Sequence, residues 1–229
     1  PEIMAGSVVL EQTLFAHGEV VDLGFVVREV RPAVELPRVL VGGNPLGAVV
    51  LEGEPGPELR RYRFRYAVDE DDPGVQEGVQ RIVVEQSDAA GNQMADRESV
   101  PRVTFDFHGP RVLDARVSPS LAMFGSRVQI SLTLDEPPAE GSPRLRVVPE
   151  APFGSASGAG LSWSFAATVD DAFPAEEYRF FVDLVDPAGN AALGVALESS
   201  PGEPLLLEVD LRPPEIVAGS VALEQALYA

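Results

Sequence analysis

Histidine and serine are among the residues of this chain that could act in acid–base or nucleophilic catalysis. The two histidines, His17 and His108, lie far apart in the sequence, and neither has an evident acidic or nucleophilic partner there. A catalytic triad needs three groups within mutual hydrogen-bonding reach. No serine lies in a GxSxG motif, and no P-loop, dinucleotide-binding fingerprint or HExxH motif occurs. The sequence therefore predicts a protein that is not an enzyme.

Two reactive residue types are missing from the chain. There is no cysteine, and all 17 basic residues are arginine. Disulfides, thiol catalysis and cysteine zinc sites are therefore excluded, and so are Schiff bases and crosslinks between lysine and asparagine. Stability must come from packing or from bound ions.

The chain is strongly acidic, with 36 acidic residues against 17 basic ones and a formal charge of −19. This charge should repel nucleic acid phosphates and anionic membranes, and it favours divalent cations as small partners. No apolar run approaches the roughly 20 residues of a membrane span. We expect neither nucleic acid binding nor membrane insertion.

The densest acidic run is Asp69–Asp72, which has a shorter counterpart in Asp170 and Asp171. A divalent cation would relieve the repulsion between adjacent carboxylates, but consecutive loop residues seldom converge on one ion. The shorter counterpart lacks half of the ligands. We therefore interpret both runs as solvated charge.

One turn sequence occurs twice, as Asp88–Asn92 (DAAGN) and as Asp186–Asn190 (DPAGN). In such a turn the aspartate side chain can accept hydrogen bonds from the backbone that follows, while glycine and asparagine tolerate positive φ. A structural turn is the first interpretation of both segments.

Alternation of polar and apolar residues with period two recurs along the chain and predicts half-buried strands. Residues 61–66 alternate arginine with aromatic residues, and Leu161, Trp163 and Phe165 alternate with serine. Trp163 could in principle stack on a sugar ring. Because it shares the apolar face of its strand, we expect it in the core instead.

Aligned on the repeated turn, the chain falls into two diverged copies, residues 1–109 and 110–213, each predicted to be one domain. Each copy offers about seven short strands with turn signals between them, and neither shows a helical apolar stripe. The sequence therefore predicts an all-β protein of two tandem immunoglobulin-like β-sandwich domains. The strands expected in the first copy are 2–14, 19–27, 37–42, 47–52, 59–68, 79–87 and 100–107.

The opening segment returns at the end of the chain, because PEIMAGSVVLEQTLFA (1–16) reappears as PEIVAGSVALEQALYA (214–229). Residues 214–229 are therefore predicted to be the first strand of a third repeat in an array. An isolated strand is not stable in water, so it needs a partner. That partner could be the adjoining domain, further repeats, or a second copy of the chain that exchanges this strand.

The order of these motifs resembles the bacterial Ig-like repeats of large surface adhesins and secreted filamentous proteins. The likeness rests on a strand that runs into DxAGN and a later strand that closes in DxxxP, here Asp106–Pro110 and Asp210–Pro214. The chain departs from that family in lacking lysine and in its linker residues. The resemblance implies an extracellular or cell-surface location in a bacterium and a role as a spacer.

The resemblance also implies a metal. In related adhesin repeats such aspartates help to hold calcium at domain junctions, which makes Asp88, Asp106, Asp186 and Asp210 candidate ligands. Calcium takes six to eight oxygen ligands, so Asp88 with Asp106, and Asp186 with Asp210, would need backbone carbonyls, water or a neighbouring loop as well.

Three functions are compatible with this sequence. The favoured one is a non-enzymatic structural spacer, a segment of a long extracellular array that forms an adhesin shaft, stalk or filament. One alternative is a filament subunit that assembles by exchange of residues 214–229. The other is a glycan-binding module, which would expose an aromatic platform.

Overall fold

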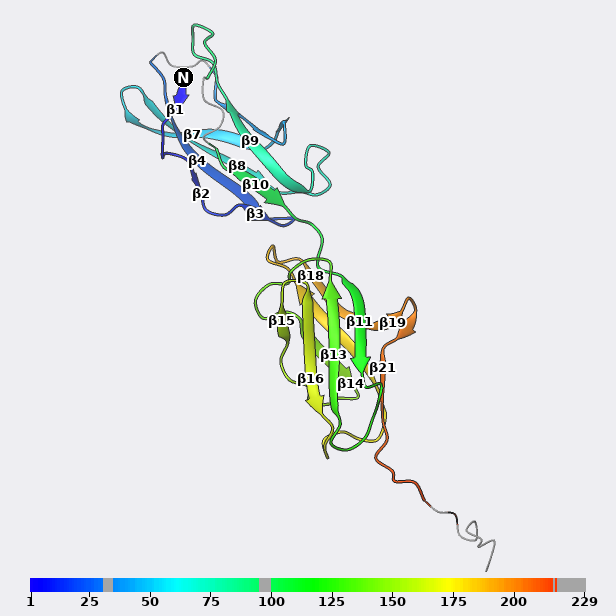
Figure 1. The fold of residues 1–229 in the computed structure, drawn as a ribbon. Helices are drawn as coiled ribbons and strands as arrows, with labels where there is room; N and C mark the ends of the chain where they lie inside the picture. The colour runs from blue at the N-terminus through cyan, green and yellow to red at the C-terminus, as the bar shows by residue number, and fades with distance from the viewer. Residues whose placement is uncertain (31–34, 95–99, 216, 218–229) are drawn as a thin grey trace, which may run out of the picture. The chain divides into compact units, whose positions relative to one another are not determined.

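The computed structural model describes residues 1–30, 35–94, 100–215 and 217 (Figure 1). Its described residues form β-strands and turns and contain no helix, and hence none that could cross a membrane. The prediction of an all-β protein with tandem immunoglobulin-like sandwiches is confirmed. Contacts divide the chain into two compact units. The first is Pro1–Gly109 together with Asp186–Ala191, and the second is Pro110–Val185 with the chain from Ala192 onward.

In the described residues of the first sandwich, ten strands form two sheets. One sheet has the order β1-β4-β8-β7 with β2 also paired to β4, and the other has the order β3-β10-β9-β5-β6. The strands are β1 (Glu2–Ile3), β2 (Val9–Leu10), β3 (Leu14–Phe15), β4 (Val20–Arg28), β5 (Arg38–Val41), β6 (Asn44–Pro45), β7 (Ala48–Gly56), β8 (Leu59–Ala67), β9 (Gly78–Glu85) and β10 (Arg102–Phe105).

The second sandwich repeats this plan. One sheet has the order β11-β13-β16-β15, the other has β12-β21-β17-β14 with β18 paired to β17, and β19 pairs with β20. The strands are β11 (Val112–Ser118), β12 (Leu121–Ala122), β13 (Arg127–Leu134), β14 (Arg144–Val148), β15 (Ser157–Ala159), β16 (Ser162–Thr168), β17 (Glu177–Val185), β18 (Ala191–Ala196), β19 (Glu198–Ser200), β20 (Glu203–Pro204) and β21 (Leu206–Val209).

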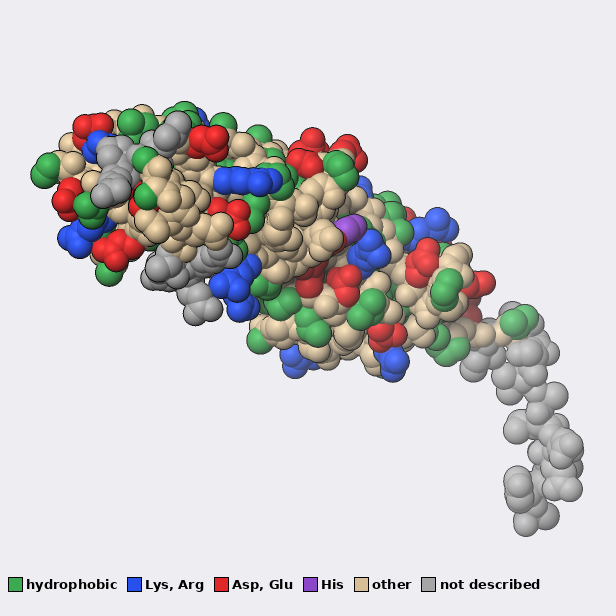
Figure 2. Space-filling model, turned by 90° about the horizontal axis from the view of Figure 1, so that it is seen from above, with side chains coloured by type: hydrophobic (Ala, Val, Ile, Leu, Met, Phe, Trp, Pro, Cys, Tyr) green, Lys and Arg blue, Asp and Glu red, His purple; other side chains and the backbone are tan. Residues whose placement is uncertain are grey.

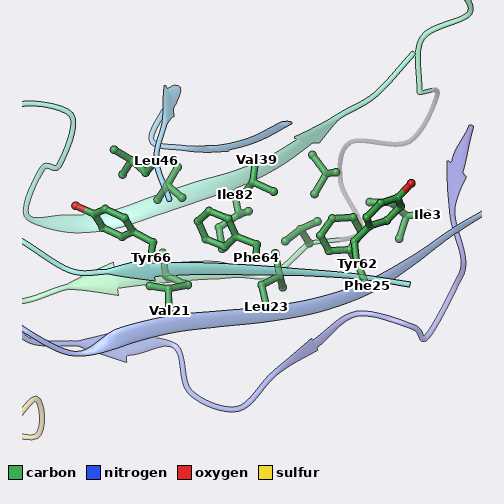
Figure 3. Packing of buried hydrophobic residues seen from close by; sticks show 14 of the residues in the cluster. Ile3, Val21, Leu23, Phe25, Val39, Leu46, Tyr62, Phe64, Tyr66 and Ile82 are labelled. Atoms are coloured by element: carbon green, nitrogen blue, oxygen red, sulfur yellow. The ribbon is translucent and has the colours of Figure 1, made fainter. Parts of the chain in front are cut away.

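Period-two alternation places the core of the first sandwich between its two sheets. On β8 the side chains of Tyr62, Phe64 and Tyr66 are buried, while the arginines between them face outward, as the sequence predicts. Figure 3 shows Phe64 near Leu23 of β4 and Ile82 of β9, and Tyr62 beside Phe25 of β4. Burial of such apolar surface is the main favourable contribution to folding.

The second sandwich has a core of its own. Its buried cluster includes Ile130 and Leu132 of β13 and Tyr178 and Phe180 of β17. The two hydrophobic clusters are separate sets of residues, one for each sandwich. Each sandwich therefore has a hydrophobic core formed by its own side chains.

The opening segment of the first sandwich is divided between the sheets, so the expectation of one strand over 2–14 is wrong. β1 and β2 pair antiparallel with β4, whereas β3 pairs parallel with β10 of the opposite sheet. A turn with Gly6 at φ 72° separates β1 from β2. β11 and β12 divide in the same way, because β11 pairs with β13 and β12 pairs parallel with β21.

The surface carries the acidic excess of the sequence. Figure 2 shows Asp and Glu side chains recurring across the visible face, interspersed with arginines and with exposed hydrophobic residues. Several arginines pair with these carboxylates, such as Arg63 with Asp22 and Arg60 with Glu54. Glu29 and Asp186 are exceptions to this surface location, because their side chains are buried.

Candidate functional site

The first repeated turn is held by the side chain of its own aspartate. Asp88 Oδ1 accepts hydrogen bonds from the backbone N–H groups of Ala90 and Asn92, both at 2.9 Å, and Asp88 Oδ2 accepts one from the Asn92 amide at 2.9 Å. Gly91 takes a φ of 84°. These bonds lower the pKa of Asp88, and the bond from the Asn92 amide has the largest effect.

The second repeated turn has the same geometry. Asp186 Oδ1 accepts from the Asn190 N–H at 2.9 Å, Oδ2 accepts from the Asn190 amide at 2.8 Å, and Gly189 has a φ of 94°. Asp186 is only 1% exposed, so a lost bond there would leave a buried polar group unsatisfied. The interpretation of both segments as structural turns agrees with these contacts.

The other two candidate ligands end the last strands of the sandwiches. Asp106 follows β10 and donates its backbone N–H to the Phe15 carbonyl at 3.0 Å, and Asp210 follows β21 and donates to the Ala122 carbonyl at 3.0 Å. The Asp210 side chain accepts a bond from the Arg212 N–H at 2.9 Å. Asp106 and Asp210 therefore occupy equivalent positions.

The pairing expected within each copy does not occur. Phe105 pairs with Gly78 at the start of β9, whereas Asp88 follows the end of that strand. About 23 Å of strand thus separates Asp88 from Asp106, at roughly 3.3 Å per residue. Asp186 and Asp210 are separated likewise along β17, because Glu177 pairs with Glu208. Antiparallel pairing puts the turn and the closing aspartate of one copy at opposite ends of its sandwich.

The first compact unit does bring two of the four candidates together. The carboxylates of Asp106 and Asp186 offer oxygens within 4.8 Å of each other. The Asn190 amide donates to the Asp106 carbonyl at 3.0 Å. Burial raises the pKa of Asp106, and the charge of Asp186 raises it further. A cation at this pair would offset that repulsion.

In the acidic run after β8, the carboxylates of Asp69 and Asp72 accept hydrogen bonds from nearby groups. Asp69 Oδ1 accepts from the Asp71 N–H at 3.0 Å. Asp72 Oδ1 accepts from the Gly74 N–H at 2.8 Å, and Asp72 Oδ2 accepts from the Tyr66 hydroxyl at 3.2 Å. The described residues bring no three metal ligands together in this loop. The interpretation of the run as solvated charge stays a prediction.

Both histidines have acidic neighbours that the sequence did not reveal. His17 Nδ1 lies 3.8 Å from Asp69 Oδ1, and His108 Nδ1 lies 2.8 Å from Glu77 Oε2. The loops that bring these residues together are far apart in the sequence, so no local spacing could have shown it. All four side chains are about half exposed, and neither pair forms a Ser–His–Asp arrangement among the described contacts.

Sequence reasoning also missed a buried polar cluster in the first sandwich. Glu29, which follows β4, accepts hydrogen bonds from the Tyr62 hydroxyl at 2.9 Å and from the Gln86 amide at 2.7 Å. Burial raises the pKa of Tyr62 to about 12. Three distant segments contribute to the cluster, and none of them carries a local motif.

Trp163 packs on the core of the second sandwich, as expected. Its ring is partly buried against the hydrophobic cluster, and its indole Nε1 donates to the Gly160 carbonyl at 2.9 Å. A sugar platform would need the ring face to be free. The geometry therefore does not favour the glycan-binding alternative.

Comparison with solved structures returns immunoglobulin-like and fibronectin-like domains. The fibronectin(III)-like modules of Clostridium thermocellum CbhA are 11% identical with a TM-score of 0.33, over 90% of this chain and 94% of theirs. The D00-D0 domain of intimin is 10% identical with a TM-score of 0.32, over 83% and 98%. The ectodomain of mouse nectin-like molecule 4 is 17% identical with a TM-score of 0.40, over 92% and 65%.

These likenesses are too distant to carry an argument about function. No protein-family model matches the chain, and neither does the sequence of any curated protein. The fold is defined by the strand order and register described above.

Proposed function

We propose that this chain is a segment of an extracellular bacterial array of Ig-like domains, and that it acts as a spacer without enzymatic activity. The observation that carries the proposal is the return of the opening segment at Pro214. Two sandwiches built on one plan, followed by the start of the first one again, are the arrangement of a repeat array.

The structure of the first copy supports this interpretation of the repeated segment. In residues 1–16 the buried apolar side chains are Ile3 and Phe15. The repeat keeps the first as Ile216 and replaces the second by Tyr228, another aromatic residue. Thr13 and Val9, which also differ in the repeat, are exposed. The repeat therefore keeps an aliphatic or aromatic residue at each position that is buried in the first copy.

The linkers support a spacer that resists bending. Pro110 begins the second copy, Pro213 ends it, and Pro214 begins the returning segment. Proline fixes φ near −65° and so limits the conformations of the chain where one copy gives way to the next. Separate cores allow copies to be added without rebuilding those already present.

Small-angle X-ray scattering tests the spacer on proteins that contain one, two or three periods, where a period is residues 1–213 and holds both sandwiches. We expect the maximum dimension to rise by an equal step with each period, because each period adds the same pair of sandwiches. A maximum dimension that stays nearly constant, because the periods collapse onto one another, contradicts the proposal.

A second candidate function is assembly by strand exchange, which the retained core residues of 214–229 favour. In this form the segment of one chain occupies the position of residues 1–16 in another. Light scattering should then show oligomers that grow with concentration. Tyr228→Asp, at the position of buried Phe15, should abolish them, whereas Ala222→Asp, at the position of exposed Val9, should not. Monomers at every concentration refute this candidate.

We also propose calcium as a partner of Asp106 and Asp186. Binding to the folded state alone would stabilise it in proportion to the logarithm of the calcium concentration. Calorimetry should show a rise in Tm with calcium that a chelator reverses and that Asp106→Asn removes. The exposed Asp114→Asn serves as control and should keep the rise. This proposal is overturned if the Tm of the wild-type protein does not change when calcium is added.

A further inference from the structure

We propose that an apolar patch on the second sandwich is the docking surface for the sandwich that begins at Pro214. The patch consists of Leu121, Met123 and Phe124, which are 60%, 70% and 61% exposed. They lie within four consecutive residues of the chain, and a concentration of exposed apolar side chains is a feature of interaction surfaces. The inference rests on the proposed array, because it takes the next copy as the occupant.

The patch lies where the chain leaves the second sandwich. Leu121 pairs with Glu208, and the Asp210 N–H donates to the Ala122 carbonyl at 3.0 Å, directly beside Met123. Three residues then separate Asp210 from Pro214. Four residue steps span at most about 14 Å of extended chain, so the next copy must start close to the patch.

The fold does not require apolar residues in this turn. The equivalent turn of the first sandwich is formed by Ala16, His17 and Gly18, which correspond to Met123, Phe124 and Gly125. The Gly18 N–H donates to the Val68 carbonyl at 2.8 Å, and the Gly125 N–H donates to the Val169 carbonyl at the same distance. The two turns share this backbone hydrogen bond although their side chains differ. The fold therefore does not explain why Met123 and Phe124 are large and apolar.

The first sandwich of this chain shows what the start of the next copy would present. Glu2 pairs with Arg28 at the end of β4, and Val30 follows two residues later. Val30 is 73% exposed and Leu36 is 56% exposed. Leu36 and Met94 also line a cavity of about 330 Å³, whose seven other lining residues are polar or charged. The end that must lie within the reach of the linker therefore carries apolar side chains of its own.

The linker makes a weak apolar contact sufficient. Tethering by a short linker gives an effective concentration in the millimolar range, so two small patches can remain associated without a large interface. Docking at this joint would add to the stiffness that Pro213 and Pro214 impose. We infer that the joint between successive repeats is apolar.

Distances between spin labels test the docking in a tandem protein, in which two 213-residue periods (residues 1–213) follow one another. The chain lacks cysteine, so Ser131→Cys in the first 213-residue period and Val50→Cys in the second period provide two unique sites, both exposed on strands. We expect a narrow distance distribution that becomes at least twofold broader in Met123→Ser/Phe124→Ser. The matched control is Leu113→Ser, which removes a 66% exposed leucine near the other end of β11.

The outcomes separate the docking from the array. Equal widths in the parent tandem and in Met123→Ser/Phe124→Ser overturn the docking, even when the second period is folded. Broadening by Leu113→Ser as well also overturns it, because the effect is then not specific to the patch. If the second 213-residue period fails to fold in the parent tandem, as judged by its calorimetric transitions, the array itself is refuted.

Discussion

The ion pair of Asp22 and Arg63 joins the outer faces of β4 and β8 and makes stability depend on pH. Arg63 donates to both oxygens of Asp22 at 2.6 Å. The hydrogen bond from Arg63 holds the pKa of Asp22 below its usual value. The pair therefore contributes fully above the unfolded pKa of about 3.9, and this contribution is lost as the pH falls through the folded pKa.

Asp22→Asn should consequently destabilise the first sandwich at pH 7 and have little effect near pH 2. Urea unfolding at the two pH values measures the difference. Asp114, which pairs with Arg116 at 2.9 Å on one exposed strand, provides the control. Asp114→Asn should change the unfolding midpoint little at either pH, because exposed pairs contribute little. An equal loss for Asp22→Asn at both pH values contradicts the role of its charge.

The buried aspartate of the second turn should matter more than an exposed one. Asp186→Ala removes the side-chain acceptor of the Asn190 N–H and one of the acceptors of the Asn190 amide, which should cost about 1–3 kcal/mol of unfolding free energy. Asp170→Ala removes a single exposed bond to the Ala172 N–H and should cost less. Urea unfolding of both variants measures this, and equal losses would show that burial is not the cause.

At the scale of strands and turns, the connection from β6 to β7, which carries the chain from one sheet to the other, depends on Gly47. This glycine has a φ of 66°, and an added Cβ would overlap the Arg65 carbonyl and the Phe64 ring. Gly18 has a φ of 82° but open space around it. Gly18→Ala should cost only the backbone strain of about 1–2 kcal/mol, and Gly47→Ala should cost clearly more. Thermal unfolding of the two variants compares them, and similar losses contradict the overlap.

The long strands could be predicted from the sequence because each buries every second residue. Residues 59–68 were expected as a strand, and β8 occupies Leu59–Ala67. The opening segment was expected as a single strand but is divided between the two sheets. Its alternation is weak, and its pairing depends on β4 and β10, which are distant in the sequence.

The candidate site was predictable only in its local parts. The hydrogen bonds of Asp88 and Asp186 lie within five residues, so the turn sequence alone indicates them. The partners of Asp106 and His108 come from other segments. Only the strand register reveals that Asp88 and Asp106 lie at opposite ends of one sandwich.

At the scale of the whole molecule, the two separate cores predict two unfolding transitions. Phe25 in the first core is 1% exposed, and Leu132 in the second is 2% exposed. Truncating a buried side chain to alanine costs about 3–5 kcal/mol for phenylalanine and about 2–5 kcal/mol for leucine. Each substitution should therefore lower the Tm of its own sandwich and leave the other transition in place.

Trp163 distinguishes the two transitions, because it is the one tryptophan of the chain and pairs with Leu132 across β13 and β16. Leu132→Ala should lower the midpoint followed by tryptophan fluorescence. Phe25→Ala should lower only a calorimetric transition that the fluorescence does not follow. A single transition that both substitutions shift equally would mean that the sandwiches unfold as one cooperative unit, and a spacer made of independent modules would then lose its physical basis.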